Sequence, residues 1–505
     1  MEIEPERFAA LGHRLVDRIA RHLEALPRGR VTTGEPASEV RAALDSQRPL
    51  PADGTPAGAL LDRAADLLFE HSLFNGHPRF LGYITSSAAP IGALADLLAA
   101  SVNANVGAWT LAPLATEIEV QTVRWIAELI GYPAACGGLL VSGGNVANFV
   151  GFLAGRTARA GWDVRNRGLR EPAAPALRLY ASEETHTWVQ KAADLFGLGT
   201  DAIRWIPTDM DLRMDVPALR ARVEADRAAG ARPFLVVGTA GSVTTGAIDP
   251  LPQIAALCRE HGLWFHVDGA YGGFAAALPT APPDLLGLRE ADSLAIDPHK
   301  WLYAPLEAGC VLVREPAALS GAFSYHPPYY NLAEEVVNFV DYGLQNSRGF
   351  RALKVWLQLQ QAGRKGYVQM IGEDVRLAGE LFRAAKRHPE MEALTLSLSI
   401  ATFRYVPRDL RRAAREPHVE AYLNELNREL LSRLERGGEV FVSTAVIRGR
   451  FALRACIVNF RTSERDVEAL PEIVSRVGRE LDAAQRPKDL RPKPPAGPAR
   501  RRAAR

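Results

Sequence analysis

Cysteine is scarce in this sequence. Its 505 residues include four cysteines, and none of them has the close spacing of a metal-binding pair. They are Cys136, Cys258, Cys310 and Cys456. Three of the four lie in apolar or small-residue stretches. A disulfide framework and a cysteine-based metal site are therefore not expected, and we expect reduced thiols in a cytoplasmic protein.

Long apolar runs are also missing. No stretch approaches the roughly 20 uncharged apolar residues that span a bilayer. The first residues, MEIEPERFAALGHRL, are acidic and amphipathic, unlike an export signal. With 47% hydrophobic and 23% charged residues, the chain can bury a large core and suggests two or three lobes. We expect a soluble protein that has no contact with a membrane.

The net charge of +2 comes from one end of the chain. Residues 486–505 hold eight basic residues and one acid, a net +7, which leaves about −5 for the body. The Pro-rich, basic segment 484–505 is expected to be a disordered tail. Because the body has no basic stripe with interleaved aromatic residues, dedicated nucleic-acid binding is not expected.

The hydrophobic pattern divides the rest of the chain into three regions. Residues 1–85 contain amphipathic helical patterns whose apolar faces need a partner, either the body or a second subunit. Residues 86–360 alternate short apolar runs with helical segments, which predicts a mostly parallel sheet with helices on both faces. Residues 361–483 suggest a smaller α+β domain. The predicted fold class is α/β, with a helical N-terminal segment and a small C-terminal domain.

Residues with chemical potential stand where the predicted strands end, and ligands gather at the carboxyl ends of the strands in such a sheet. The predicted strands are LLVS (139–142), LRLYAS (177–182), PFLVVGT (233–239), LWFHVD (263–268), DSLAID (292–297) and GCVLVRE (309–315). At or just behind the first five ends stand Gly143, Gly144, His186, Thr239, Asp268, Asp297, His299 and Lys300.

Each of these residues has an ordinary explanation when it is taken alone. SGGN can be a plain loop before a helix, Asp268 can cap the next segment, and a turn lysine such as Lys300 is usually solvated. The loop also lacks the Walker pattern and the GxGxxG of a dinucleotide site.

Taken together, these features match one cofactor. Glycines at a helix N-terminus suit a phosphate, and an imidazole such as His186 can stack on a ring. A fixed carboxylate suits a protonated ring nitrogen, and a lysine can react with an aldehyde. These are the four contacts that pyridoxal 5'-phosphate requires.

Four segments carry a resemblance to a known family. The family is the pyridoxal-phosphate-dependent group II amino-acid decarboxylases, which include the aromatic-L-amino-acid decarboxylases. The first segment, HPRFLGY (77–83), resembles the family's HPRFFAYF, and the second, APLATEIEVQTVRW, resembles its SPACTELE. The third, FHVDGAYGG, resembles its HVDAAYAG, and the fourth, DPHKWL, resembles its NPHKWL. The similarity runs from about residue 5 to about residue 480. It implies a fold-type I, aminotransferase-like homodimer with a seven-stranded type of sheet and active sites at the subunit interface.

The resemblance also implies roles for individual residues. Lys300 would form the Schiff base with the cofactor, Asp268 would partner its ring nitrogen, and His186 would stack on the ring. The remaining cofactor contacts implied are Gly143 and Gly144 at the phosphate loop, Thr239 near the ring, and Asp297 and His299 near the phosphate. The family usually has asparagine at position 297, and a carboxylate beside a phosphate is repulsive unless it is turned away or paired.

The reaction type depends on a further segment, because this cofactor serves several kinds of reaction. GAFSYHPPYYN (321–331) resembles the family's mobile catalytic loop, and Tyr329 matches its proton-donating tyrosine. Phenylalanine at this position would favour the oxidative aldehyde synthases, so Tyr329 favours decarboxylation to the amine. An aldehyde synthase, an aminotransferase and, remotely, a non-catalytic dimeric binding protein remain alternatives.

The residues that would surround the substrate match the aromatic decarboxylases only in part. Tyr83 and Trp301 match aromatic pocket positions, whereas Ile84 and Gly107 stand where those enzymes tend to have phenylalanine. The pocket therefore has less ring surface than is usual in them.

Two further residues bear on the choice of substrate. Ser347 is near a position where serine accompanies phenolic substrates in plant relatives, and Arg348 could serve an anionic group. The substrate-binding residues expected are Tyr83, Ile84, Ser86, Gly107, Trp301, Ser347 and Arg348. An aromatic amino acid is the expected substrate, and acidic amino acids such as glutamate or aliphatic ones are the alternatives.

Overall fold

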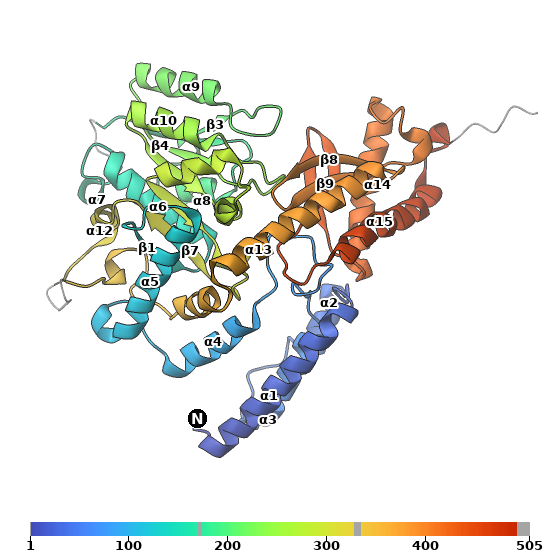
Figure 1. The fold of residues 1–505 in the computed structure, drawn as a ribbon, viewed down its shortest axis with the longest axis horizontal. Helices are drawn as coiled ribbons and strands as arrows, with labels where there is room; N and C mark the ends of the chain where they lie inside the picture. The colour runs from blue at the N-terminus through green and yellow to red at the C-terminus, as the bar shows by residue number, and fades with distance from the viewer. Residues whose placement is uncertain (1, 170–173, 328–334, 492–505) are drawn as a thin grey trace, which may run out of the picture.

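The chain forms two lobes, each built around a sheet and joined by one long helix (Figure 1). The computed structural model describes residues 2–169, 174–327 and 335–491. The joining helix is α13 (Ala352–Arg387). Its path is interrupted at Gly363, whose φ of 60° and ψ of 175° are not helical and lie where only glycine is at ease.

The larger lobe contains a seven-stranded sheet in the order β1-β7-β6-β5-β4-β2-β3. Its strands are β1 (Gly137–Val141), β2 (Leu177–Ser182), β3 (Ile203–Ile206), β4 (Arg232–Thr239), β5 (Trp264–Asp268), β6 (Ser293–Ile296) and β7 (Gly309–Val313). β7 is antiparallel to both of its neighbours, and the other four pairings are parallel. β1, β2, β4, β5 and β6 therefore all end at the same edge of the sheet.

Helices cover both faces of this sheet, which explains why its strands are apolar throughout. They are α5 (Pro113–Ile130), α6 (Gly144–Arg159), α7 (Val164–Arg167), α8 (Trp188–Leu195), α9 (Val216–Ala228), α10 (Leu251–His261) and α12 (Ala317–Phe323), while the single turn α11 (Pro298–Trp301) follows the end of β6. Alternate side chains of β1 enter different cores. Leu140 packs with residues of α5 and α10, whereas Leu139 and Val141 pack with residues of α6 and α8. Each face of the sheet thus has its own apolar core.

The smaller lobe contains an antiparallel sheet in the order β10-β11-β9-β8. Its elements are β8 (Met391–Ser397), β9 (Ile400–Tyr405), α14 (Pro417–Gly437), β10 (Ser443–Ile447), β11 (Arg450–Cys456) and α15 (Glu464–Gln485). A separate apolar core includes residues of α13, α14 and α15 and of this sheet. Ser463 and Asp466 form a capping box that fixes the start of α15.

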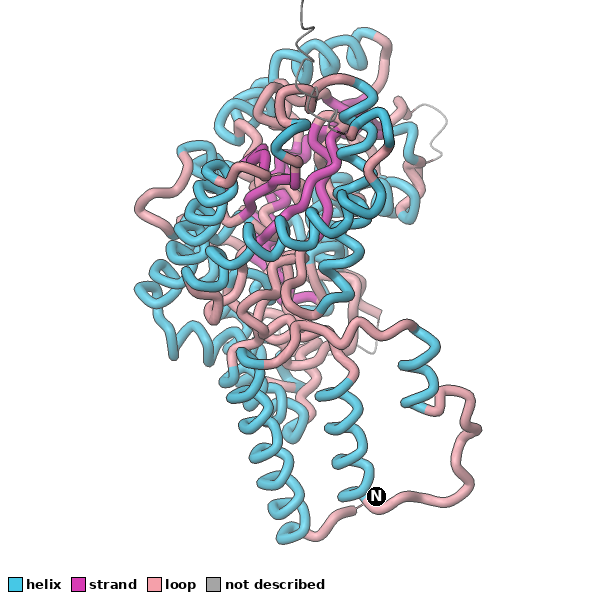
Figure 2. Tube along the Cα trace, turned by 90° about the vertical axis from the view of Figure 1, so that its right-hand side faces the viewer, coloured by secondary structure: helices cyan, strands magenta, loops and turns pink. Residues whose placement is uncertain are grey.

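The N-terminal helices extend from the body as an arm (Figures 1 and 2). They are α1 (Pro5–Ala25), α2 (Ala37–Leu44) and α3 (Ala57–Glu70), and α4 (Pro90–Val102) follows them against α13. α1 and α3 lie side by side, and Asp62 joins them through ion pairs of 3.0 Å to Arg14 and 3.1 Å to Arg18. No residue of α1 is buried. The apolar faces of the arm are thus only partly covered within one chain.

The predicted fold class is confirmed by the mixed, mostly parallel sheet with helices on both faces. Two short strands, β3 and β10, were not predicted. β3 is IRWI, with two of its four side chains buried, and β10 alternates buried and exposed residues beside a turn. The run LSLSIATFRYV (396–406) contains the end of β8, a turn at Leu398 and Ser399, and β9.

The division into domains remains a prediction. Its expected boundary at residue 360 falls inside α13, which packs against both lobes. Within the ranges that the structure describes, no helix combines the length and apolar composition needed to cross a membrane.

Candidate active site

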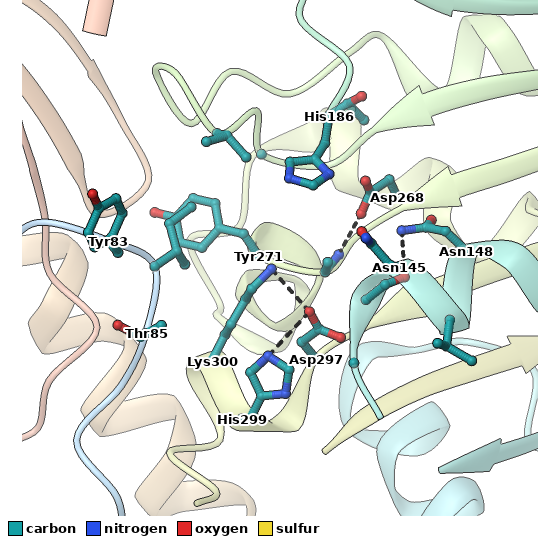
Figure 3. Close-up of a pocket in the computed structure, with 18 of the residues that line it drawn as sticks. Tyr83, Thr85, Asn145, Asn148, His186, Asp268, Tyr271, Asp297, His299 and Lys300 are labelled. Carbon is teal, nitrogen blue, oxygen red and sulfur yellow. Dashed lines mark hydrogen bonds and ion pairs between the residues drawn. The ribbon is translucent and has the colours of Figure 1, made fainter. Parts of the chain in front are cut away.

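A cavity of about 570 Å³ lies where the parallel strands of the large sheet end (Figure 3). This is the edge at which such sheets bind ligands. The cavity is lined by all eight residues predicted to bind the cofactor, namely Gly143, Gly144, His186, Thr239, Asp268, Asp297, His299 and Lys300. The fold therefore brings together residues that are more than 150 positions apart in the sequence, although their individual roles remain predictions.

Lys300 lies on the single turn of α11, directly behind β6. Its Nζ lies 3.0 Å from Oδ2 of Asp297, and Nε2 of His299 lies 3.6 Å from the same oxygen. Figure 3 shows both side chains directed at Asp297. Asp297 is 1% exposed, and within the described chain its Oδ1 has no hydrogen-bond partner. A lysine that can react thus begins in an ion pair with a buried carboxylate.

The loop between β1 and α6 approaches this group closely. Gly143 precedes α6 with a φ of 139°, a conformation that L side chains rarely adopt. A Cβ atom on Gly144 would lie 2.7 Å from Oδ2 of Asp297, so there is no room for a side chain. The first backbone N–H groups of α6 have no partner within the helix, which suits an anion.

Asp268 ends β5, and neighbouring groups fix its orientation. Its Oδ2 accepts a hydrogen bond of 2.8 Å from Nε1 of Trp188, and its Oδ1 accepts one of 3.2 Å from the backbone N–H of Ala270. On the adjacent strand, Thr239 has a buried hydroxyl without a hydrogen-bond partner in the described residues. A fixed carboxylate and an unused hydroxyl therefore face one space, as a bound polar heterocycle requires.

His186 comes from the loop between β2 and α8. Figure 3 shows its ring pointing into the space that Lys300 and Asp268 also face. Partial burial lowers the pKa of His186, and the nearby Asp268 carboxylate opposes this shift only in part. The imidazole is therefore neutral at pH 7 and can offer a flat, uncharged face to a ring.

These features together fit pyridoxal 5'-phosphate. The glycine loop can hold a phosphate, the unused Thr239 hydroxyl and the fixed Asp268 carboxylate can meet the polar atoms of a pyridine ring, and Lys300 can reach an aldehyde. Asp297, whose carboxylate lies beside the glycine loop, carries a charge that does not suit that phosphate. The fold and the site thus define an enzyme of the pyridoxal-phosphate-dependent, fold-type I class.

Comparison with known proteins narrows this class to a family. Residues 44–405 match the model of the pyridoxal-dependent decarboxylase conserved domain. The chain is 32% identical to an aromatic-L-amino-acid decarboxylase of Bacillus atrophaeus, over 94% of this chain and 98% of that one. It is 26% identical to a phenylacetaldehyde synthase of a Rosa hybrid cultivar, over 92% of each.

A solved structure agrees in fold. The crystal structure of Oryza sativa TDC with PLP and tryptamine has a TM-score of 0.87 and 26% identity, with 95% of this chain and 99% of that one covered. The chain therefore belongs to the pyridoxal-dependent decarboxylase family. It is a pyridoxal-phosphate-dependent amino-acid decarboxylase, and its substrate is an amino acid.

Two of the predicted substrate residues do not line the cavity of this chain. Trp301 is fully buried; it stacks on Tyr271 with the ring centroids 4.9 Å apart, and its Nε1 donates to Asp374. Arg348 is 3% exposed and forms an ion pair with Glu119, which is 0% exposed. Neither side chain lines the cavity, because the indole N–H of Trp301 is hydrogen-bonded to Asp374 and the guanidinium of Arg348 is paired with Glu119, and both acids are buried.

The other predicted substrate residues fall into three groups. Tyr83 and Ile84 line the cavity, and Ser86 beside them donates a hydrogen bond of 2.9 Å to the carbonyl of His299. Gly107 and Ser347 do not line the cavity of this chain. The predicted proton donor, Tyr329, lies outside the described residues.

Several cavity residues were not predicted from the sequence. Asn145, Asn148 and Tyr271 lie inside or beside motifs already recognised, so their proximity to those motifs was a usable signal. Arg454 comes from β11 of the other lobe. It donates hydrogen bonds to the carbonyls of Gly82 and Val243, which are 372 and 211 positions away in the sequence. No local pattern could have indicated this position.

The buried position of Arg348 leads to a first prediction. Arg348→Gln leaves the Glu119 carboxylate buried without its counter-ion, and we expect the free energy of unfolding to fall by about 3–5 kcal/mol. Denaturant unfolding followed by circular dichroism measures this change. The control is Arg351→Gln, because Arg351 pairs with the half-exposed Glu307 and should lose less than about 1 kcal/mol. A stable Arg348→Gln protein with weakened substrate binding would show that Arg348 serves the substrate after all.

A second buried acid supports the turn that carries Lys300. Oδ2 of Asp374, on α13, accepts hydrogen bonds of 2.8 Å from both Nε1 of Trp301 and the hydroxyl of Tyr303. Burial raises the pKa of Asp374 to about 7, although both donors act in the opposite direction. The folded protein therefore holds a proton here at pH values where the unfolded chain has lost it.

This difference predicts how stability depends on pH. Between about pH 4 and pH 7 the folded state binds more protons at Asp374 than the unfolded state does, so this residue's contribution to the free energy of unfolding falls as the pH rises through this window. We expect Asp374→Asn to remove this decrease in the free energy of unfolding with rising pH, which amounts to about 4 kcal/mol at most. Unfolding of wild type and variant at pH 5, 6, 7 and 8 measures it. Parallel profiles would contradict the prediction.

Proposed function

We propose that this enzyme decarboxylates an aromatic L-amino acid to the corresponding amine and CO2. The observation that carries the proposal is the meeting of Lys300, Asp268 and His186 in one cavity, next to the glycine loop at the start of α6. This geometry does not favour the alternative of a non-catalytic binding protein, because the residues predicted to contact the cofactor all line the same cavity.

Each of these residues has a physical task. Bound pyridoxal phosphate supplies an electron sink for the electron pair left behind when the carboxylate leaves as CO2. Asp268 keeps a fixed negative charge in the cavity, which favours a protonated ring nitrogen. Lys300 provides the amine that attaches the cofactor, and the neutral His186 offers a ring face without adding charge.

The preference for an aromatic substrate rests on the part of the cavity wall that the cofactor does not need. Tyr83, Ile84 and Val243 give that wall an apolar and aromatic character. Arg348, the residue that the sequence suggested for an anionic group, pairs with Glu119 away from the cavity. The arginine that does line the cavity, Arg454, already donates hydrogen bonds to the carbonyls of Gly82 and Val243 and to the hydroxyl of Ser443. An aromatic side chain of the substrate would gain free energy by packing against this wall, whereas a carboxylate in the substrate's side chain would lose its hydration there.

An aldehyde synthase is the second candidate, because a phenylacetaldehyde synthase is among the relatives at similar identity. Tyr329 argues for the amine, since the resemblance gives the tyrosine at this position the role of returning a proton to the substrate carbon. The products separate the two candidates. Amine with CO2 supports decarboxylation, and aldehyde with hydrogen peroxide supports the synthase.

The protein is further proposed to act as a homodimer. Six apolar side chains between α4 and the first turn of α5 are 53–74% exposed: Leu94, Leu97, Leu98, Val102, Leu111 and Leu114. An apolar surface of this kind usually marks an interaction site. Gly107 lies in the same segment, and its carbonyl accepts a hydrogen bond from the backbone N–H of Val340. If a second copy of the chain covered this surface, Gly107 and Ser347 of one subunit could line the cavity of the other subunit.

The proposed reaction predicts a clear loss on changing one residue. Lys300→Ala should lose the visible absorbance of the attached cofactor and at least about 10³-fold of CO2 release, because it removes the amine that holds and orients the cofactor. The wild type, loaded with cofactor, is first screened with the proteinogenic amino acids to find the substrate. If the variant kept both the absorbance and the turnover, the role of Lys300 would be wrong. If a non-aromatic amino acid were the best substrate, only the substrate proposal would fail.

The proposed dimer has its own test. Leu98→Glu places a charge in the exposed apolar surface of α4, and we expect it to convert a dimer to a monomer in sedimentation velocity and to lower activity at least tenfold. Leu286→Glu, at a leucine that is 56% exposed on another part of the molecule, is the matched control. A wild-type protein that sediments as a monomer at every concentration, or a dimeric Leu98→Glu variant, would reject this interface.

A further inference from the structure

Asp297 has a position that conflicts with the cofactor. Its carboxylate is 1% exposed and lies between Lys300 and the glycine loop. Its Oδ2 is so close to Gly144 that a Cβ atom there would lie 2.7 Å from it. The group faces the backbone of the first turn of α6, where the phosphate would be held.

The neighbours of this carboxylate give it only one counter-charge. Lys300 is the one cation that the described residues place within 4 Å of it, at 3.0 Å. His299 lies at 3.6 Å, but burial lowers its pKa, so its imidazole is neutral at pH 7. Nδ1 of His299 accepts a hydrogen bond of 3.1 Å from the backbone N–H of Ala308. The charge of Asp297 is therefore balanced chiefly by the lysine that the cofactor must use.

We propose that Asp297 weakens the hold of this site on the cofactor's phosphate, so that the enzyme exchanges its cofactor more readily than it would with an uncharged residue at position 297. Two effects act in the same direction. The carboxylate repels the phosphate dianion in a poorly hydrated site, where charges act strongly on one another. The carboxylate also engages Lys300 in an ion pair of 3.0 Å, and this pair must be broken before the lysine amine can join an aldehyde.

The proposal rests on the use of the cofactor and not on the choice of substrate. It would survive if the proposed aromatic substrate were wrong. Conversely, decarboxylation of an aromatic amino acid would stand even if Asp297 had no influence on cofactor binding.

The test measures binding directly on cofactor-free, full-length protein. Dissociation constants are obtained by fluorescence quenching for the wild type, Asp297→Asn and Asp297→Ala. Two variants are compared because asparagine adds an amide donor, whereas alanine removes the carboxylate without adding a donor. Asp284→Asn is the matched control, since Asp284 pairs with Arg213 on another part of the molecule. Circular dichroism and thermal unfolding establish that each variant is folded.

Three ligands separate the contributions. Pyridoxal 5'-phosphate has both the phosphate and the aldehyde. Pyridoxamine 5'-phosphate keeps the phosphate but has no aldehyde, so it binds without joining Lys300. Pyridoxal keeps the aldehyde and lacks the phosphate.

We expect both Asp297 variants to bind pyridoxamine 5'-phosphate at least tenfold more tightly than the wild type, a change of about 1.4 kcal/mol. The gain for pyridoxal 5'-phosphate should be equal or larger, and the gain for pyridoxal should be smaller. Asp284→Asn should match the wild type.

Three results would overturn the proposal. Equal binding of pyridoxamine 5'-phosphate by all the folded proteins would show that Asp297 does not act on the phosphate. A gain with asparagine but not with alanine would assign the effect to a new amide donor. A gain confined to the two aldehydes would assign it to Lys300 alone.

Discussion

The active site depends on one constraint, which is that both faces of the large sheet are buried. Because helices cover each face, a polar side chain on β1, β2, β4, β5 or β6 can reach solvent or a ligand only where its strand ends. The five ends fall at one edge, since β7 runs against both of its neighbours. Packing of the sheet therefore brings the site residues together without the need for direct contacts between them. These are the glycine loop, His186, Thr239, Asp268 and the turn with Lys300.

This constraint also explains how much could be predicted from the sequence. The strand ends were visible because a continuous apolar run that stops at a polar residue is a local signal, and the predicted cofactor residues all reach the cavity. The positions of Trp301 and Arg348 were not visible, because each is fixed by an acid on a distant element, Asp374 or Glu119. The short strands β3 and β10 were not predicted for a related reason. Each is stabilised mainly by pairing with a neighbouring strand, and this pairing is not visible in the local sequence.

Buried acids around the cavity divide into two kinds. Asp249, Asp374 and Glu119 accept hydrogen bonds from backbone or side-chain donors that hold the strands and turns in place. Burial raises the pKa of Asp249 to about 6 and that of Asp374 to about 7, so part of the scaffold responds to pH. Asp268 and Asp297 instead present oxygen atoms to the cavity. The same residue type thus serves rigidity in one place and ligand chemistry in another.

Arg454 joins the two lobes at the mouth of the cavity. Besides the carbonyls of Gly82 and Val243, its guanidinium donates to the hydroxyl of Ser443. A hinge motion that swung the small sheet away from the larger lobe would have to break the hydrogen bond from Arg454 to the carbonyl of Val243 and expose a buried cation. The two lobes are therefore tied together at this point, and opening the cavity by separating them would cost this contact.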